Sequence, residues 1–145
     1  MATKTQLRSP TNRLYNLIVK QGADFPGLLR WKIAPGDTAR SYAGYTARGQ
    51  IRKKPGGDIL ASFTMEFVSA SADYHGGLLF TLPASVTGAL KPNVKLEDIP
   101  KNYRRLTRDL LPTKAYYYDI ETESPTGFVL REIEGSVLVT AEVTA

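Results

Sequence analysis

The chain has 145 residues, 42% hydrophobic and 23% charged, which is the size and composition of one globular domain. It has no cysteine and one histidine, so disulfides, cysteine-based zinc sites and a cluster of histidine metal ligands are excluded within one chain. The net charge of +5 is uneven, because residues 1–111 hold 17 basic and 8 acidic side chains, a balance of +9, whereas residues 112–145 have a balance of −4.

Residues 1–13 form the first segment of the chain. They are rich in Thr, Lys, Arg and Ser and lack the apolar run of a signal peptide, so we expect an extended arm that is either disordered or ordered only by a partner. No stretch approaches the length of about 18 apolar residues that a membrane span needs. We therefore expect a protein made in a cytoplasm, with residues 14–145 forming a single domain after the arm.

Alternation of apolar and polar residues dominates the chain from residue 14 and predicts β-strands. The clearest run is Ile59–Phe67, in which every second residue is apolar. Tyr45–Lys53 alternates too, and the Pro and Gly residues of 54–58 between the two runs predict a hairpin turn. The other predicted strands are Leu14–Lys20, Leu28–Ile33, Leu78–Leu82, Ala115–Glu123, Gly127–Ile133 and Ser136–Val143.

Further local signals refine this arrangement. In Leu28–Ile33 we expect Leu29, Trp31 and Ile33 to face the core. A helical turn is predicted at Pro83–Leu90, a second hairpin turn at Ser124–Gly127, and a bulge or bend near Glu134 and Gly135. Together these elements predict an all-β protein, an Ig-like antiparallel β-sandwich of about seven or eight strands.

Residues 91–111 interrupt the alternation and form a long, partly basic insertion. Two interpretations are open: a solvated crossover between the sheets, or an arm that packs on a neighbouring subunit. With the N-terminal arm, this insertion supplies the predicted interface residues, which are Arg8, Arg13, Tyr103, Arg104, Arg105, Leu106 and Arg108.

Side chains able to carry out chemistry are few. Ser71, Asp73 and His75 share one short segment, but a catalytic triad needs its members brought together by the fold, and no Gly-x-Ser-x-Gly motif is present. We therefore predict a structural turn histidine. Asp119, Glu121 and Glu123 alternate along one strand, which favours the solvated face of a sheet over a calcium or glycosidase site.

Tyr116, Tyr117 and Tyr118 place two tyrosines on one strand face and one on the other. A tyrosine hydroxyl at this point can cap a corner of a sandwich, and an aromatic platform for a sugar is the alternative. The basic side chains are dispersed over several segments instead of forming one stripe between aromatic residues, which argues against nucleic acid as a partner. We predict no catalytic residue, no metal and no cofactor.

Several segments carry a family resemblance: residues 17–25, 45–57, 78–90, 117–127 and 131–144. They resemble the small β-sandwich structural proteins of tailed bacteriophages, which are similar to the N-terminal domain of phage baseplate upper proteins. The likeness covers most of residues 14–143 and departs at 91–111, which is longer than the connection expected there. It implies a structural role in the virion without enzymatic activity, and it supplies no site residues.

The expected function is therefore that of a structural protein in the tail, baseplate or fibre-attachment region of a phage particle. Its expected partners are other copies of itself and other phage structural proteins. A capsid decoration or neck protein is the alternative within this class. A carbohydrate-binding module for host recognition is the alternative from another class.

Overall fold

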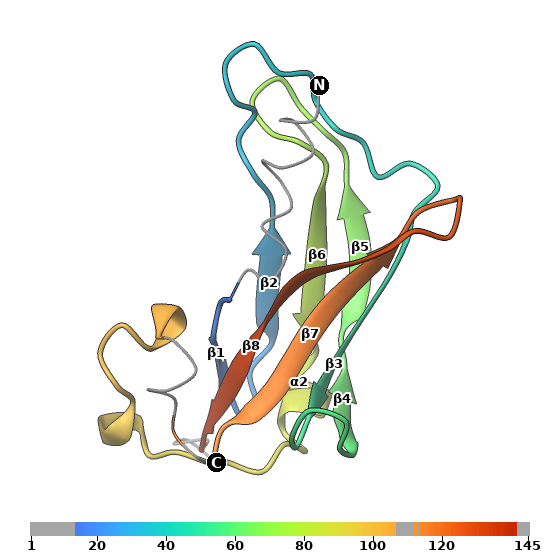
Figure 1. Ribbon diagram of the computed structural model, residues 1–145. Coiled ribbons are helices and arrows are strands. Elements are labelled where there is room, and N and C mark those ends of the chain that lie inside the picture. The colour runs from blue at the N-terminus through green and yellow to red at the C-terminus, as the bar shows by residue number, and fades with distance from the viewer. Residues whose placement is uncertain (1–13, 107–111, 113, 142–145) are drawn as a thin grey trace.

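The computed structural model describes residues 14–106, 112 and 114–141, which form two β-sheets packed face to face (Figure 1). The strands are β1 (Leu17–Lys20), β2 (Phe25–Leu29), β3 (Thr46–Arg52), β4 (Ile59–Ser62), β5 (Thr64–Val68), β6 (Gly77–Leu82), β7 (Tyr116–Glu123) and β8 (Val129–Thr140). The helical segments in the described ranges are short: α2 (Ala84–Thr87), η1 (Leu96–Asp98) and η2 (Tyr103–Arg105). None of them is long and apolar enough to cross a membrane.

The larger sheet has the strand order β1-β8-β7-β3-β4 and the smaller has the order β2-β6-β5. Alternate side chains of both sheets fill the space between them, among them Leu17, Ile51, Leu78, Tyr118 and Val137. Two packed sheets connected in this order form an Ig-like β-sandwich, which confirms the predicted fold class. One pairing departs from the antiparallel expectation, because β1 runs parallel to β8.

Both predicted hairpin turns are present. Between β3 and β4 the N–H of Lys53 donates to the carbonyl oxygen of Asp58 (3.2 Å). Between β7 and β8 the N–H of Ser124 donates to the carbonyl oxygen of Phe128 (2.9 Å), and Gly127 supplies the positive φ of the turn (89°). These turns fix the register of β3 with β4 and of β7 with β8 within the larger sheet.

The second strand begins and ends earlier than predicted. It contains Pro26 and Gly27, which usually argue against a strand. An edge strand tolerates proline, and Gly27 is required because a Cβ there would meet the ring of Phe80 at 2.6 Å. Trp31 therefore lies beyond the strand end and packs, half-buried, against the margin of the core. The expectation that Leu28–Ile33 is one strand was wrong.

Two other strand predictions change for topological reasons. The run Ile59–Phe67 divides at Phe63, so that β4 belongs to the larger sheet and β5 to the smaller. The two strands predicted between Gly127 and Val143 are one continuous strand, β8.

The bulge in β8 lies at Glu132, opposite the step from Ile120 to Glu121, and not at Gly135. Gly135 has a different role, because a Cβ there would collide with the carbonyl oxygen of Tyr15. The glycine thus permits the close passage of the chain that enters β1.

Candidate assembly interface

The insertion packs on the chain's own larger sheet. The side-chain amide of Asn16 donates to the carbonyl oxygens of Tyr103 (2.7 Å) and Leu106 (3.0 Å), and its oxygen accepts from the N–H of Ser136 (3.0 Å). The Tyr103 hydroxyl meets the Ser136 hydroxyl at 2.5 Å. The insertion therefore contacts β8 at two places: Asn93 accepts from the backbone N–H of Val139 (2.7 Å), and Tyr103 packs against Ser136. From Glu132 to Thr140 the side chains of β8 are buried on both faces of the sheet.

This packing changes the predicted interface. Tyr103 is 2% exposed, so it belongs to the interior of the domain and its place among the interface residues was wrong. Arg104 and Arg105 are exposed and Leu106 is half-buried, so these three remain at the surface. Arg8, Arg13 and Arg108 lie outside the described residues.

Arg104 and Arg105 border a groove of 810 Å³ between β1 and β2, which we call the seam. Here the edge strand of the larger sheet faces the edge strand of the smaller one. The seam is lined by Leu14, Tyr15, Leu17, Ile18, Lys20, Asp24, Phe25, Pro26, Gly27, Leu28, Leu29, Arg30, Phe80, Arg104, Arg105 and Ile133. It combines an apolar floor with two strand edges, a geometry that suits the docking of another chain.

Basic side chains surround the seam. Lys20, Arg30, Arg104 and Arg105 are exposed along it, whereas Asp24 is the acidic residue of the lining. The guanidinium of Arg30 lies 3.8 Å from the centre of the Tyr74 ring, which holds it in place. The sequence did not predict this site, because residues 18–30 and residues 104–105 are far apart in the chain. Only the order of the strands in the two sheets brings them together.

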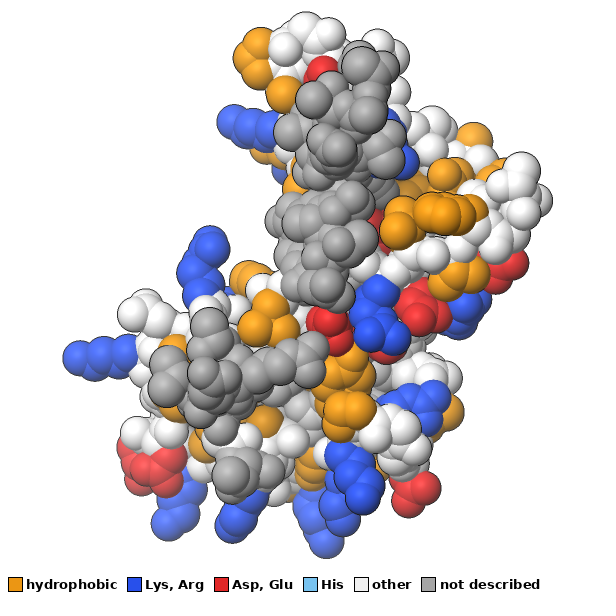
Figure 2. Space-filling model, viewed as in Figure 1, with side chains coloured by type: hydrophobic (Ala, Val, Ile, Leu, Met, Phe, Trp, Pro, Cys, Tyr) orange, Lys and Arg blue, Asp and Glu red, His pale blue; other side chains and the backbone are white. Residues whose placement is uncertain are grey.

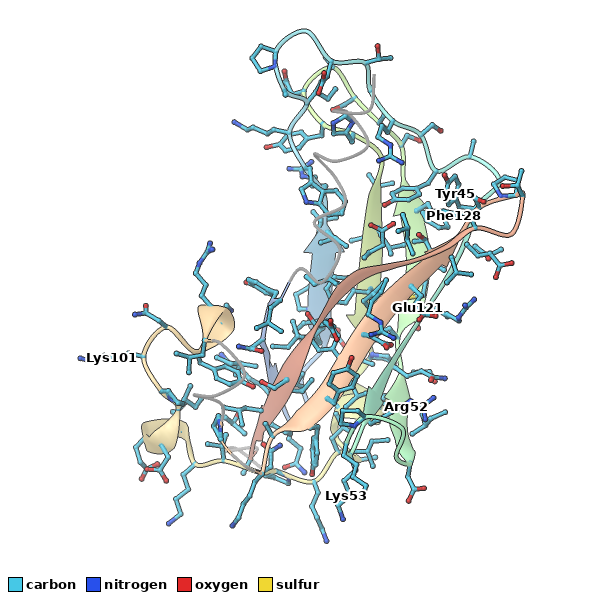
Figure 3. All side chains as sticks on the ribbon, viewed as in Figure 1. Tyr45, Arg52, Lys53, Lys101, Glu121 and Phe128 are labelled. Atoms are coloured by element: carbon cyan, nitrogen blue, oxygen red, sulfur yellow. The ribbon has the colours of Figure 1, made fainter. Side chains whose placement is uncertain are left out.

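A second exposed apolar surface lies at the tip of the β7–β8 hairpin. Phe128 is 65% and Val129 45% exposed. Tyr45 lies at the same end of the sandwich as Phe128 (Figure 3), and apolar side chains gather there in the space-filling view (Figure 2).

His75, which shares a short segment with Ser71 and Asp73, has a structural role. His75 is 3% exposed, and its Nδ1 accepts a hydrogen bond from the backbone N–H of Arg40 (3.0 Å). The backbone N–H of His75 donates to the carbonyl oxygen of Trp31 (3.0 Å). His75 therefore ties two loops together, as predicted for a turn histidine, whereas Ser71 and Asp73 are exposed.

The alternating carboxylates lie on the outer face of the larger sheet, as predicted, and meet arginines across the strands (Figure 3). Arg48 contacts Glu121 at 3.0 Å and Glu123 at 3.3 Å, and Arg131 lies 3.5 Å from Asp119. Burial raises the pKa of Asp119, while Arg131 opposes this shift. Over the described ranges, no three His, Cys, Asp or Glu side chains are grouped so that they could hold a metal ion.

The acidic side chains of residues 112–145 do not gather on one surface. Glu132 and Glu134 are 4% and 3% exposed. Glu132 accepts hydrogen bonds from the hydroxyls of Thr122 (2.7 Å) and Tyr42 (3.0 Å). Two of the six acidic side chains in residues 112–145 therefore lie in the interior.

All three consecutive tyrosines use their hydroxyls within the chain. Tyr116 donates to the carbonyl oxygen of Lys91 (2.7 Å), Tyr118 to that of Tyr15, and Tyr117 to the carboxylate of Glu134. Burial raises the pKa of each of them, and Glu134 adds to the shift at Tyr117. The bonds of Tyr116 and Tyr118 fit the predicted corner cap, and Tyr117 lies half-buried on the outer face.

Comparisons with known proteins add little to this picture. No protein-family model matches the chain, and no curated protein matches it. Among solved structures it is similar to the crystal structure of the ZIG-8–RIG-5 IG1–IG1 heterodimer, with 13% identity, 90% of this chain and 83% of that chain covered, and a TM-score of 0.30. At that score, the Ig-like assignment rests on the strand order described above.

Proposed function

We propose that this protein is a non-enzymatic structural subunit that works by docking to other protein chains. The observation that carries the proposal is the seam, where two strand edges and an apolar floor meet at the surface. Covering an apolar hollow bordered by strand edges with another chain is favourable, because backbone groups and apolar side chains both gain partners.

The polar groups support a non-enzymatic role. The carboxylate of Glu132 accepts from Thr122 and Tyr42, and the Nδ1 atom of His75 accepts from Arg40. Asp119, Glu121 and Glu123 lie beside arginines on an open sheet face. Each of these groups is therefore engaged in a structural bond, whereas catalysis would need it to face a substrate.

The proposed location is the tail, baseplate or fibre-attachment region of a tailed bacteriophage virion. This narrower part of the proposal is supported by the resemblance in residues 17–25, 45–57, 78–90, 117–127 and 131–144. The partners would be further copies of the chain and other structural proteins of the particle.

Mass spectrometry of purified particles, with and without tails, tests the location. We expect peptides of this protein in tailed particles and their loss when tails are removed. Detection in tailless capsids would instead place it among decoration or neck proteins, and absence from all particles would overturn the virion role. Size-exclusion chromatography with light scattering tests association between copies independently of the particle.

A further inference from the structure

Backbone hydrogen bonds show which groups of β1 face the seam. The N–H of Tyr15 donates to the carbonyl oxygen of Glu134 (2.9 Å), and that of Gln21 to Thr140 (3.0 Å). Since alternate residues of a strand point their N–H groups to the same side, the odd-numbered residues 15–21 donate to β8. The N–H groups of Asn16, Ile18 and Lys20 therefore point away from β8, to the outer edge.

The first of these outward positions already shows how the edge is used. The N–H of Asn16 donates to the carbonyl oxygen of Arg104 (2.9 Å), so η2 occupies the edge at that residue. Within residues 14–106 and 114–141, no acceptor is assigned to the N–H of Ile18 or Lys20. A strand arriving at the seam can thus continue along β1 from the point where η2 leaves it.

The opposite edge of the seam is less suited to strand pairing. β2 contains Pro26, which has no N–H, and a proline inside a strand turns its nitrogen to the open side. β2 instead contributes apolar surface through Phe25 and Leu29, with Phe80 of β6 behind them. We infer that β1 provides the hydrogen bonds and β2 the apolar wall.

The charges of the seam define the chemistry of the occupant. Its exposed rim carries Lys20, Arg30, Arg104 and Arg105 against Asp24. Residues 1–13, which precede the seam in the chain, carry Lys4, Arg8 and Arg13 and no acidic residue. Their charge is therefore a poor match for this rim, whereas an acidic segment gains attraction at each basic side chain.

We propose that the outer edge of β1 receives an extended segment of a partner protein in which apolar residues alternate with Asp or Glu. This proposal rests on the docking function above and names the partner's chemistry. Because side chains of a strand alternate between faces, the apolar set would cover Phe25 on the apolar wall of β2 while the carboxylates reach the arginines. The added strand would extend the larger sheet to six.

Hydrogen exchange of the full chain tests whether the edge is open. In the free protein we expect fast exchange at the amides of Ile18 and Lys20 and slow exchange at Leu17 and Val19, which bond β8. A peptide of about eight alternating Glu and Val residues should slow exchange at Ile18 and Lys20 alone. Protection of these two amides in the free chain would overturn the proposal, since the chain itself would then fill the edge.

Binding of the same peptide, measured by fluorescence anisotropy, tests the charge pattern. The double variant R104E/R105E should weaken binding about tenfold, and the matched control K53E/K54E, with the same charge change on the β3–β4 turn, less than about twofold. Figure 3 shows Lys53 on that turn. Equal losses in both variants, or equal binding of a Lys–Val peptide, would overturn the proposal. The docking function is tested separately, by association between copies and by presence in particles. If the peptide fails to bind while these two results hold, the proposal for β1 is wrong and the docking function stands.

Discussion

The side-chain amide of Asn16 donates to the backbone carbonyl oxygen of Tyr103, 2.7 Å away and 87 positions later in the chain. Asn16 is fully buried, and Tyr103 is 2% exposed. The same asparagine accepts from Ser136 in β8, so one side chain joins the entry to β1, the insertion and the last strand. This bond makes the insertion a part of the domain.

Replacing Asn16 should therefore destabilise the whole fold. In Asn16→Ala the carbonyl oxygen of Tyr103 and the N–H of Ser136 lose their partners in a buried place, at a cost of about 3 kcal/mol. Urea unfolding followed by tryptophan fluorescence measures the change. A loss below about 0.5 kcal/mol would show that the insertion is held without this side chain.

The stability of the protein should fall at alkaline pH through Tyr103. Burial raises the pKa of Tyr103 from 10.0 to about 12. Between these values the unfolded chain loses the proton and the folded chain keeps it, so stability present below pH 10 is lost as the pH rises towards 12. Tyr103→Phe should make the fall in the free energy of unfolding with pH less steep, by up to about 1.4 kcal/mol per pH unit. Parallel pH curves for the two proteins would contradict the assignment.

A methyl group at Gly135 should not be accommodated. Its Cβ would press on the carbonyl carbon of Tyr15 at 2.8 Å and on Oδ1 of Asn16 at 3.0 Å. Gly135→Ala should therefore cost about 1–3 kcal/mol, measured by thermal or urea unfolding. Gly88→Ala is the control, because that exposed glycine has φ −62° and its closest new contact would be 3.1 Å. Equal losses at both positions would show that the crossing at Gly135 is not tight.

The charged face of the larger sheet should contribute little. Arg48 is 53% exposed in its side chain, so its pairs with Glu121 and Glu123 are largely in water. Arg48→Ala should cost less than about 1 kcal/mol, and the loss should disappear at high salt. Unfolding measured at low and high salt checks this. A larger, salt-independent loss would mean that Arg48 acts through packing of its stem.

Local patterns predicted most of the secondary structure. The alternation of Tyr45–Lys53 and the glycine-rich turn after it are local signals, and both the strand and the hairpin are present. The carboxylate face of β7 followed from alternation in the same way. Such features depend on residues close in sequence, so the sequence contains the information needed to predict them.

The seam could not be predicted in this way. Its lining joins Ile18, Phe80 and Arg104, which only the order of strands in two sheets brings together. Tyr103 illustrates the same limit, because a tyrosine in a basic, irregular segment has no local sign of burial. Its burial depends on Asn16 and Ser136, which are distant in sequence.

The parallel pairing of β1 with β8 has a consequence for how the chain acquires its structure. Leu17–Lys20 pair with Val137–Thr140, so nearly the whole intervening chain must be synthesised before the first strand meets its neighbour. Contacts of such sequence separation make folding slow, and on a nascent chain they leave the edges of β1 and β7 that β8 will cover without a partner. The larger sheet is therefore completed only after residue 140 has been synthesised, and until then β1 and β7 lack the strand that lies between them.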